Sequence, residues 1–86
     1  AFREVDDALV LRETLAGQLE AQRSLVEALD ETYRLSNARY REGLDGYLGV
    51  LVAQRSLYDA QRGLVALHLA FQANRITLYK ALGGGA

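Results

Sequence analysis

A seven-residue repeat of large apolar residues runs through the second half of the chain and constrains the fold most strongly. The repeat consists of Val50, Leu57, Leu64, Phe71 and Leu78. Seven residues make about two turns of an α-helix, so the repeat presents one apolar stripe to a partner helix. No stretch sustains a two-residue alternation, so strands are not expected. The pattern therefore predicts an all-α fold built on a coiled coil.

The first half carries a matching stripe, at spacings of mostly three, four and seven residues. Its members are Val5, Leu9, Leu15, Leu19, Val26, Leu29 and Tyr33, with Gln22 in the one gap. In the second half, the alternate positions of the repeat hold Gln54, Gln61, His68, Arg75 and Leu82. We expect the three glutamines to fix the register by hydrogen bonds across the seam. His68 is interpreted as a buried or half-buried packing residue.

Each half also has a second apolar row. In the first half it comprises Leu11, Leu25 and Ala28, and in the second half Leu51, Tyr58, Val65, Leu69, Ile76 and Tyr79. A helix with two apolar rows needs neighbours on two sides. A lone hairpin satisfies only one row, so the pattern favours a ring or a larger bundle.

The helical pattern breaks once, at a glycine-containing turn. We expect a single hairpin segment with a first helix over about 2–42, a tip turn at 43–46, a second helix over about 47–82 and a flexible glycine tail at 83–86. Gly43 can adopt the left-handed conformation that ends a helix. Asp45 is a plausible N-cap for the second helix, with Gly46 at its first position. The sequence thus predicts an antiparallel hairpin of two long helices.

Composition excludes several classes of function. Half of the residues are apolar and the net charge is -1, which argues against disorder and against nucleic acid as a partner. The chain has no cysteine and one histidine, and no serine has a base nearby in the sequence. We therefore expect no catalytic residue, no cofactor and no metal site. No stretch is apolar enough to span a membrane, and the absence of methionine suggests a segment of a larger protein.

Three motifs give the chain a family resemblance. The run Tyr33–Gly43 contains a Leu-Ser pair and an Arg-Tyr pair before the glycine, and the run Tyr47–Leu57 contains Val-Leu-Val-Ala-Gln. The end of the chain, Leu78–Gly85, reads Leu-Tyr-Lys-Ala-Leu-Gly-Gly-Gly. Together these motifs resemble the outer-membrane efflux proteins of the TolC/OprM-like type. The resemblance covers essentially the whole chain.

The resemblance implies a role in transport. Members of this family are homotrimers in the outer membrane of Gram-negative bacteria, and their long helices form a tunnel in the periplasm. Their partners are a periplasmic adaptor protein and an inner-membrane pump. This chain would supply one helical hairpin of the tunnel wall, with its turn at the periplasmic tip.

The resemblance also assigns roles to residues near the turn. It implies that Glu42, Gly43 and Leu44 dock to the adaptor. The candidates for the aperture or gate are Arg39, Tyr40, Arg41, Asp45, Gly49 and Val52. Simpler interpretations stay open: Arg39 and Arg41 suit the negative end of the helix dipole, Tyr40 packs on its own helix, and Asp45 caps the second helix.

Gly49 and Val52 differ from the family pattern. TolC-type members carry carboxylates at both positions, and OprM-like members retain one at the Val52 position, whereas this chain has no side chain at Gly49 and an apolar one at Val52. A ring of Val52 side chains narrows a pore by dewetting and does not bind cations. Asp45 is the alternative source of an acidic ring.

Two other classes of function compete with the channel. One is a soluble coiled-coil interaction module, such as the hairpin of an adaptor protein, and the tip motif favours the channel over it. The other is an amphipathic helix on a membrane surface, which needs a basic polar face that the mixed charges do not supply. Because its second apolar row lacks neighbours, the isolated chain is expected to self-associate, most simply as a dimer of hairpins with four helices.

Overall fold

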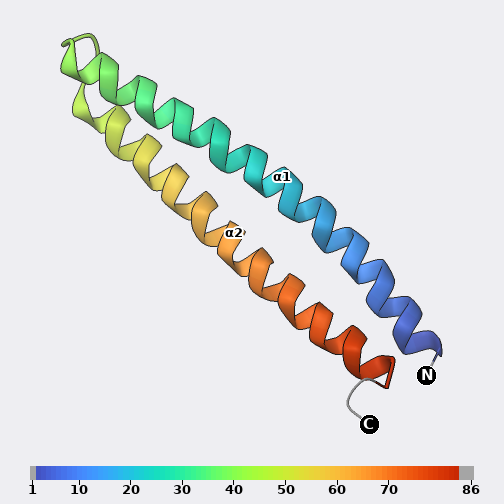
Figure 1. Ribbon diagram of the computed structural model, residues 1–86. Helices are drawn as coiled ribbons and strands as arrows, with labels where there is room; N and C mark the ends of the chain where they lie inside the picture. The colour runs from blue at the N-terminus through green and yellow to red at the C-terminus, as the bar shows by residue number, and fades with distance from the viewer. Residues whose placement is uncertain (1, 84–86) are drawn as a thin grey trace.

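The chain folds into a helical hairpin. The computed structural model describes residues 2–83, and within them it contains two antiparallel helices, α1 (Phe2–Arg41) and α2 (Tyr47–Ala81), and no strand (Figure 1). The predicted all-α hairpin is therefore confirmed. Each helix ends one residue earlier than the sequence suggested. Of the glycine tail expected at 83–86, only Gly83 is described, and 84–86 lie outside the described residues.

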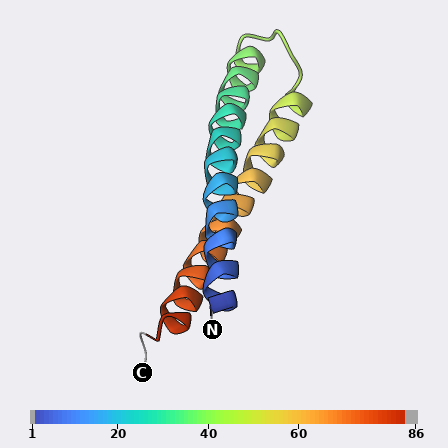
Figure 2. The same cartoon turned by 90° about the vertical axis from the view of Figure 1, so that its right-hand side faces the viewer.

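The hairpin is long and thin. Its principal extents are 63 × 17 × 13 Å, and its radius of gyration is 19.1 Å. A compact domain of this length would have a radius of gyration of about 12 Å. The two helices cross along their length, and the ends of α1 and α2 away from the turn lie side by side (Figures 1 and 2). The two helices form a single layer (Figure 1).

Large and small residues alternate along the seam between the helices. On α2 the buried residues are Val50, Ala53, Leu57, Ala60 and Asn74, and the large members of the predicted repeat at 64, 71 and 78 are half-buried. Ala53 and Ala60 follow Val50 and Leu57 at an interval of three, where their small side chains let the backbones come close. On α1, Ala8, Leu15 and Leu19 are buried. The predicted seven-residue stripe is thus the seam of the hairpin.

The expected alternate positions of the seam on α2 are wrong by one residue. Gln54, Gln61 and His68 are all exposed, because the second row of the seam lies three residues after each large side chain and not four. Arg75 and Leu82 are exposed for the same reason. On α1, Leu9 is exposed, and Arg12 lies in the seam with its guanidinium 4.4 Å from the centre of the Phe71 ring. A cation over an aromatic face replaces the expected apolar contact.

Two side-chain amides cross the seam. Gln22 donates a hydrogen bond from Nε2 to the carbonyl oxygen of Ala60 at 2.8 Å. Asn74 donates from Nδ2 to the carbonyl oxygen of Ala8 at 2.9 Å. Of the three glutamines expected at the seam, Gln22 alone makes such a bond, whereas Asn74 was not anticipated.

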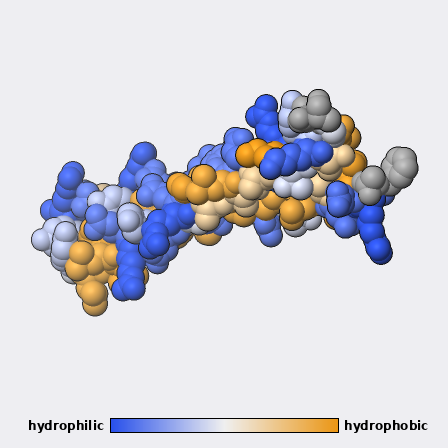
Figure 3. Space-filling view, turned by 90° about the horizontal axis from the view of Figure 1, so that it is seen from below, coloured by the Kyte–Doolittle hydropathy of each residue, from blue (hydrophilic) through white to orange (hydrophobic). Residues whose placement is uncertain are grey.

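The second apolar rows face solvent. Leu11 and Leu25 of α1 are exposed, and so are the row members Leu51, Tyr58, Val65, Leu69, Ile76 and Tyr79 of α2. Apolar surface is correspondingly visible between polar residues in Figure 3. The accessible area is 6601 Å², whereas a compact monomer of this mass exposes about 5,000 Å². The surplus of roughly 1,500 Å² is comparable to the area that a standard protein–protein interface buries.

Candidate docking tip

Helix α1 ends in a Schellman motif at Gly43. The amide of Gly43 donates to the carbonyl oxygen of Tyr40 at 3.0 Å, and the amide of Leu44 donates to that of Arg39 at 2.9 Å. Gly43 has φ +75°, a conformation that a side chain makes unfavourable and that glycine adopts freely. The left-handed conformation predicted for Gly43 is therefore confirmed. We call residues 39–48 the tip.

The expected N-cap of α2 is wrong. Helix α2 begins at Tyr47, and its N-cap is Gly46, which has extended backbone angles and provides no side-chain hydrogen bond. The carboxylate of Asp45 instead accepts hydrogen bonds from Nε and Nη2 of Arg39. A charged, two-point partner competes effectively with the backbone amides of a helix N-terminus.

The ion pair joins the last turn of α1 to the tip turn. Both side chains are about half exposed, at 48%. The hydrogen bond from Arg39 lowers the pKa of the Asp45 carboxyl below its ordinary value of 3.8. The same hydrogen bond raises the pKa of the Arg39 guanidinium. This ion pair was not predicted, because its one signal in the sequence is weak: two opposite charges six residues apart on either side of a glycine.

Two tyrosines pack together across the turn. The ring centres of Tyr40 and Tyr47 lie 4.9 Å apart with an angle of 60° between the planes. Tilted arrangements of this kind are favourable for aromatic pairs. Tyr40 thus packs against Tyr47, the first residue of the other helix. The gating role suggested for Tyr40 remains a prediction.

The outermost residues of the tip present apolar and charged groups together. Leu44 is 60% exposed and Leu48 is 73% exposed. Arg41 and Glu42, which lie in the sequence between the two partners of the ion pair, are also exposed. Leu44 was predicted as a residue of the docking surface, whereas Leu48 was not. The tip therefore exposes two leucines, one in the turn and one in the first turn of α2.

The remaining aperture candidates lie further along α2. Gly49 and Val52 are three residues apart and therefore lie on one side of the helix. Val52 is 59% exposed, and a Cβ at Gly49 would meet no atom within 4 Å. The turn brings Arg39, Tyr40 and Asp45 together. Gly49 and Val52 lie further along α2, away from that cluster.

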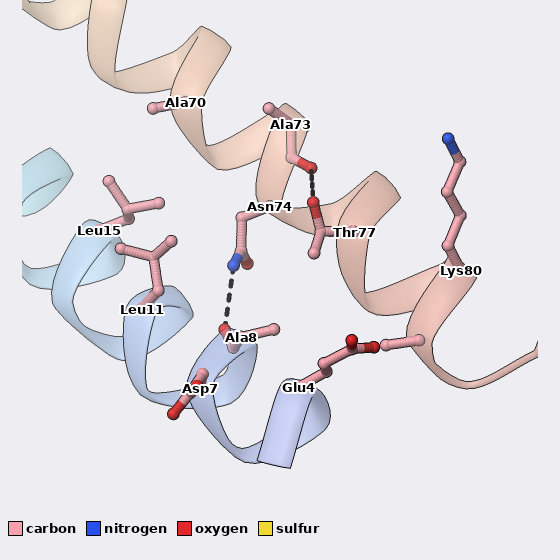
Figure 4. Close-up of a pocket in the computed structure, with 11 residues that line it drawn as sticks. Glu4, Asp7, Ala8, Leu11, Leu15, Ala70, Ala73, Asn74, Thr77 and Lys80 are labelled. Carbon is pink, nitrogen blue, oxygen red and sulfur yellow. Dashed lines mark hydrogen bonds between the residues drawn. The ribbon is translucent and has the colours of Figure 1, made fainter. Parts of the chain in front are cut away.

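An apolar groove lies at the opposite end of the hairpin. It has a volume of about 710 Å³ and is lined from both helices by residues that include Leu11, Leu15, Ala70 and Asn74 (Figure 4). Nδ2 of Asn74 is bonded to the Ala8 carbonyl, but Oδ1 of the same side chain is buried and lacks a hydrogen-bond partner within residues 2–83.

Neither a metal centre nor a membrane-spanning helix is found in the described part of the chain. Among residues 2–83, no three acidic or histidine side chains gather closely enough to hold a metal ion. Neither helix combines the length and the apolar character that crossing a bilayer requires.

Comparison with known proteins identifies the family. The sequence profile of the outer membrane efflux protein family matches residues 1–84. The chain belongs to this family. It is 49% identical over 85 residues to the probable efflux pump outer membrane protein TtgC of Pseudomonas putida. It is 46% identical over 85 residues to the cation efflux system protein CusC of Escherichia coli.

These matches cover most of this chain and a small part of each relative. The chain is covered to 99%, but it spans 18% of TtgC and 19% of CusC. A crystal structure of CusC, from work on its folding and transmembrane channel formation, superposes with a TM-score of 0.87 at 43% identity. That match covers 94% of this chain and 19% of the CusC chain. The hairpin therefore has the fold of one segment of an outer membrane efflux protein.

Proposed function

We propose that this hairpin forms part of the periplasmic tunnel wall of a trimeric outer-membrane efflux channel. Membership of the outer membrane efflux protein family over residues 1–84 carries the proposal. The exposed second apolar rows support it, because a tunnel wall needs neighbours on both sides of each hairpin. The partners of the parent protein would be two further copies, a periplasmic adaptor and an inner-membrane pump that together export small molecules.

Within this proposal, the tip docks to the adaptor. Glu42, Gly43 and Leu44 would make the contact, because the turn projects beyond both helices and exposes Leu44. Arg39, Tyr40, Arg41, Asp45, Gly49 and Val52 would face or adjoin the aperture. The 49% identity with an efflux pump outer membrane protein argues against the alternative of an adaptor hairpin.

Docking is tested in the full-length parent protein by replacing Leu44 with aspartate. Leu44 is 60% exposed and contributes little to folding, so this change alters the tip surface and leaves the hairpin intact. We expect cross-linking to the adaptor and export to fall at least tenfold. Gly43→Trp should block assembly as well, although it also strains the turn.

The control is Gln61→Glu in the same protein, which introduces a carboxylate at an exposed polar position of α2 outside the second apolar row and away from the tip. Normal adaptor cross-linking and export in the Leu44→Asp channel, at normal protein levels, would contradict docking through this tip.

The isolated chain is proposed to self-associate into a bundle of hairpins, most simply a dimer with four helices. The surplus accessible surface is large enough for one such interface. Light scattering over a range of concentrations tests this, with a mass above 9.5 kDa expected. A stable monomer at high concentration would contradict it.

A further inference from the structure

The two amide bonds across the seam belong to one register. Ala8 and Gln22 lie two heptads apart on α1, and Ala60 and Asn74 lie two heptads apart on α2. The bonds Gln22–Ala60 and Asn74–Ala8 therefore require the same alignment of the antiparallel helices. Apolar contacts that repeat every heptad distinguish this alignment only weakly from one that is slipped by seven residues.

A slipped hairpin is a real competitor because a second pair of glycines, Gly46 and Gly49, follows Gly43 in the sequence. A slip of one heptad moves the midpoint of the hairpin by half a heptad along the chain. The turn now at 42–46 would then move to about 46–49, where Gly46 and Gly49 supply conformational freedom. A Cβ at Gly49 would meet no atom within 4 Å, so packing around that residue does not oppose the move. The turn sequence alone does not select Gly43.

Gly63 distinguishes the two registers. A Cβ at Gly63 would lie 2.8 Å from Nε2 of Gln22, so the glycine leaves a notch that the Gln22 side chain fills. One heptad further along α2, the equivalent position is Ala70, which has a Cβ. In the slipped register Gln22 would meet Ala70, and the flexible end of its side chain would have to move away from the Cβ, out of the position in which it now donates its hydrogen bond.

Asn74 opposes the slip at the other end of the seam. It is 3% exposed and makes its bond (Figure 4) to the carbonyl of Ala8, a residue with a small side chain. After a slip, Leu15 would replace Ala8 beside this buried amide. A larger apolar side chain would crowd Asn74, whose Oδ1 already lacks a partner within the described chain.

We propose that Gln22, Gly63 and Asn74 form a register lock that keeps the turn at Gly43 and excludes the turn at Gly46–Gly49. The lock explains why α2 tolerates a glycine in its interior, where glycine is otherwise unfavourable. It holds Glu42 and Leu44 at the end of the hairpin, whatever the tip binds.

The register is measured by the distance between spin labels on the two helices. Glu20 and Gln54 are exposed, and the chain has no cysteine, so Glu20→Cys and Gln54→Cys carry unique labels. A slip towards the Gly46–Gly49 turn lengthens their separation along the axis by about 10 Å, which is seven residues at 1.5 Å each. Labelled chain is diluted in excess unlabelled chain so that distances within one molecule dominate.

Moving the notch tests the lock directly. The double variant Gly63→Ala with Ala70→Gly keeps the composition of α2 and shifts the notch by one heptad. We expect a second population at the longer distance. The matched control is Gly17→Ala, a change at an interior glycine of α1 where a Cβ meets nothing within 4 Å. It should keep the single native distance.

Removing both amides provides a second test that does not depend on glycine. The double variant Gln22→Ala with Asn74→Ala places a good helix former at both positions. It removes both hydrogen bonds that favour the native register over the slipped one, so we expect both label distances. A single native distance in this variant, with helicity retained, would overturn the proposal. A single native distance in the variant Gly63→Ala with Ala70→Gly would independently overturn the register lock.

Discussion

The tip and the shaft hold the same two helices by different means. At the tip, Tyr40 and Tyr47 are 42% and 50% exposed, and the ion pair beside them is also half exposed. In the shaft, by which we mean residues 5–33 of α1 and 50–78 of α2, the contacts include buried residues such as Leu19 and Ala60. Exposed contacts are screened by water, whereas buried apolar contacts are not. We infer that the shaft contributes most of the free energy of unfolding, whereas the contacts at the tip mainly set the conformation of the turn.

The largest effect is expected from a truncation in the shaft. Leu19→Ala removes a side chain that is 6% exposed and should lower the free energy of unfolding by about 2–3 kcal/mol. Leu48→Ala at the tip removes a leucine that is 73% exposed and should change it by less than about 0.5 kcal/mol. Urea unfolding at one fixed protein concentration measures both. Equal losses would remove the distinction between shaft and tip.

A smaller effect is expected at the turn. Gly43→Ala places a side chain at φ +75° and should cost about 1–2 kcal/mol. The control is Gly46→Ala, because Gly46 has φ −75°, which any residue adopts. Thermal unfolding of the two variants should therefore differ. If Gly46→Ala is the more damaging change, then the shape of the tip depends on the start of α2 and not on the end of α1.

A comparable test uses a five-residue sequence that occurs twice. Gln22 and Gln54 both lie within Ala-Gln-Arg-Ser-Leu, but Gln22 crosses the seam and Gln54 is exposed. Gln22→Ala should cost about 1 kcal/mol for the lost hydrogen bond, and Gln54→Ala should cost less than about 0.5 kcal/mol. Denaturant midpoints compare them. A greater loss in Gln54→Ala would be inconsistent with the observed seam.

The smallest effect concerns the ion pair and depends on pH. The pKa of Asp45 is lowered in the folded chain, so the pair stabilises the fold above the ordinary pKa of 3.8 and this contribution is lost as pH falls through the lower folded value. Asp45→Asn should therefore be slightly less stable than the parent chain near pH 6 and equal to it near pH 2. Melting temperatures at the two pH values test the sign. A difference that grows towards acid would contradict it.

The sequence predicted the large residues of the shaft better than the small ones. Leu57 and its heptad equivalents stand out by size and spacing, so their stripe could be recognised. Ala53 and Ala60 could not, because alanine is common on every face of a helix and carries no packing signal of its own. Without them, the second row of the seam was assigned to Gln54 and Gln61, one residue too far along.

At the tip, the backbone was easier to predict than the side chains. Gly43 followed from a local rule, since a left-handed residue ends many helices. The partner of Asp45 did not, because the contact with Arg39 exists only after the turn has folded and the two residues have been brought together. The same holds for Asn74, which looks like any polar residue until the crossing of the helices buries it.

The thickness of the hairpin, 13 Å, has a consequence for anything assembled from it. A layer one helix deep has two broad sides and no interior, so each side can meet a different environment while the same backbone separates them. Copies added edge to edge enlarge such a sheet of helices without thickening it. A barrier of any width could thus be built while every residue stays within a single helix diameter of both of its surfaces.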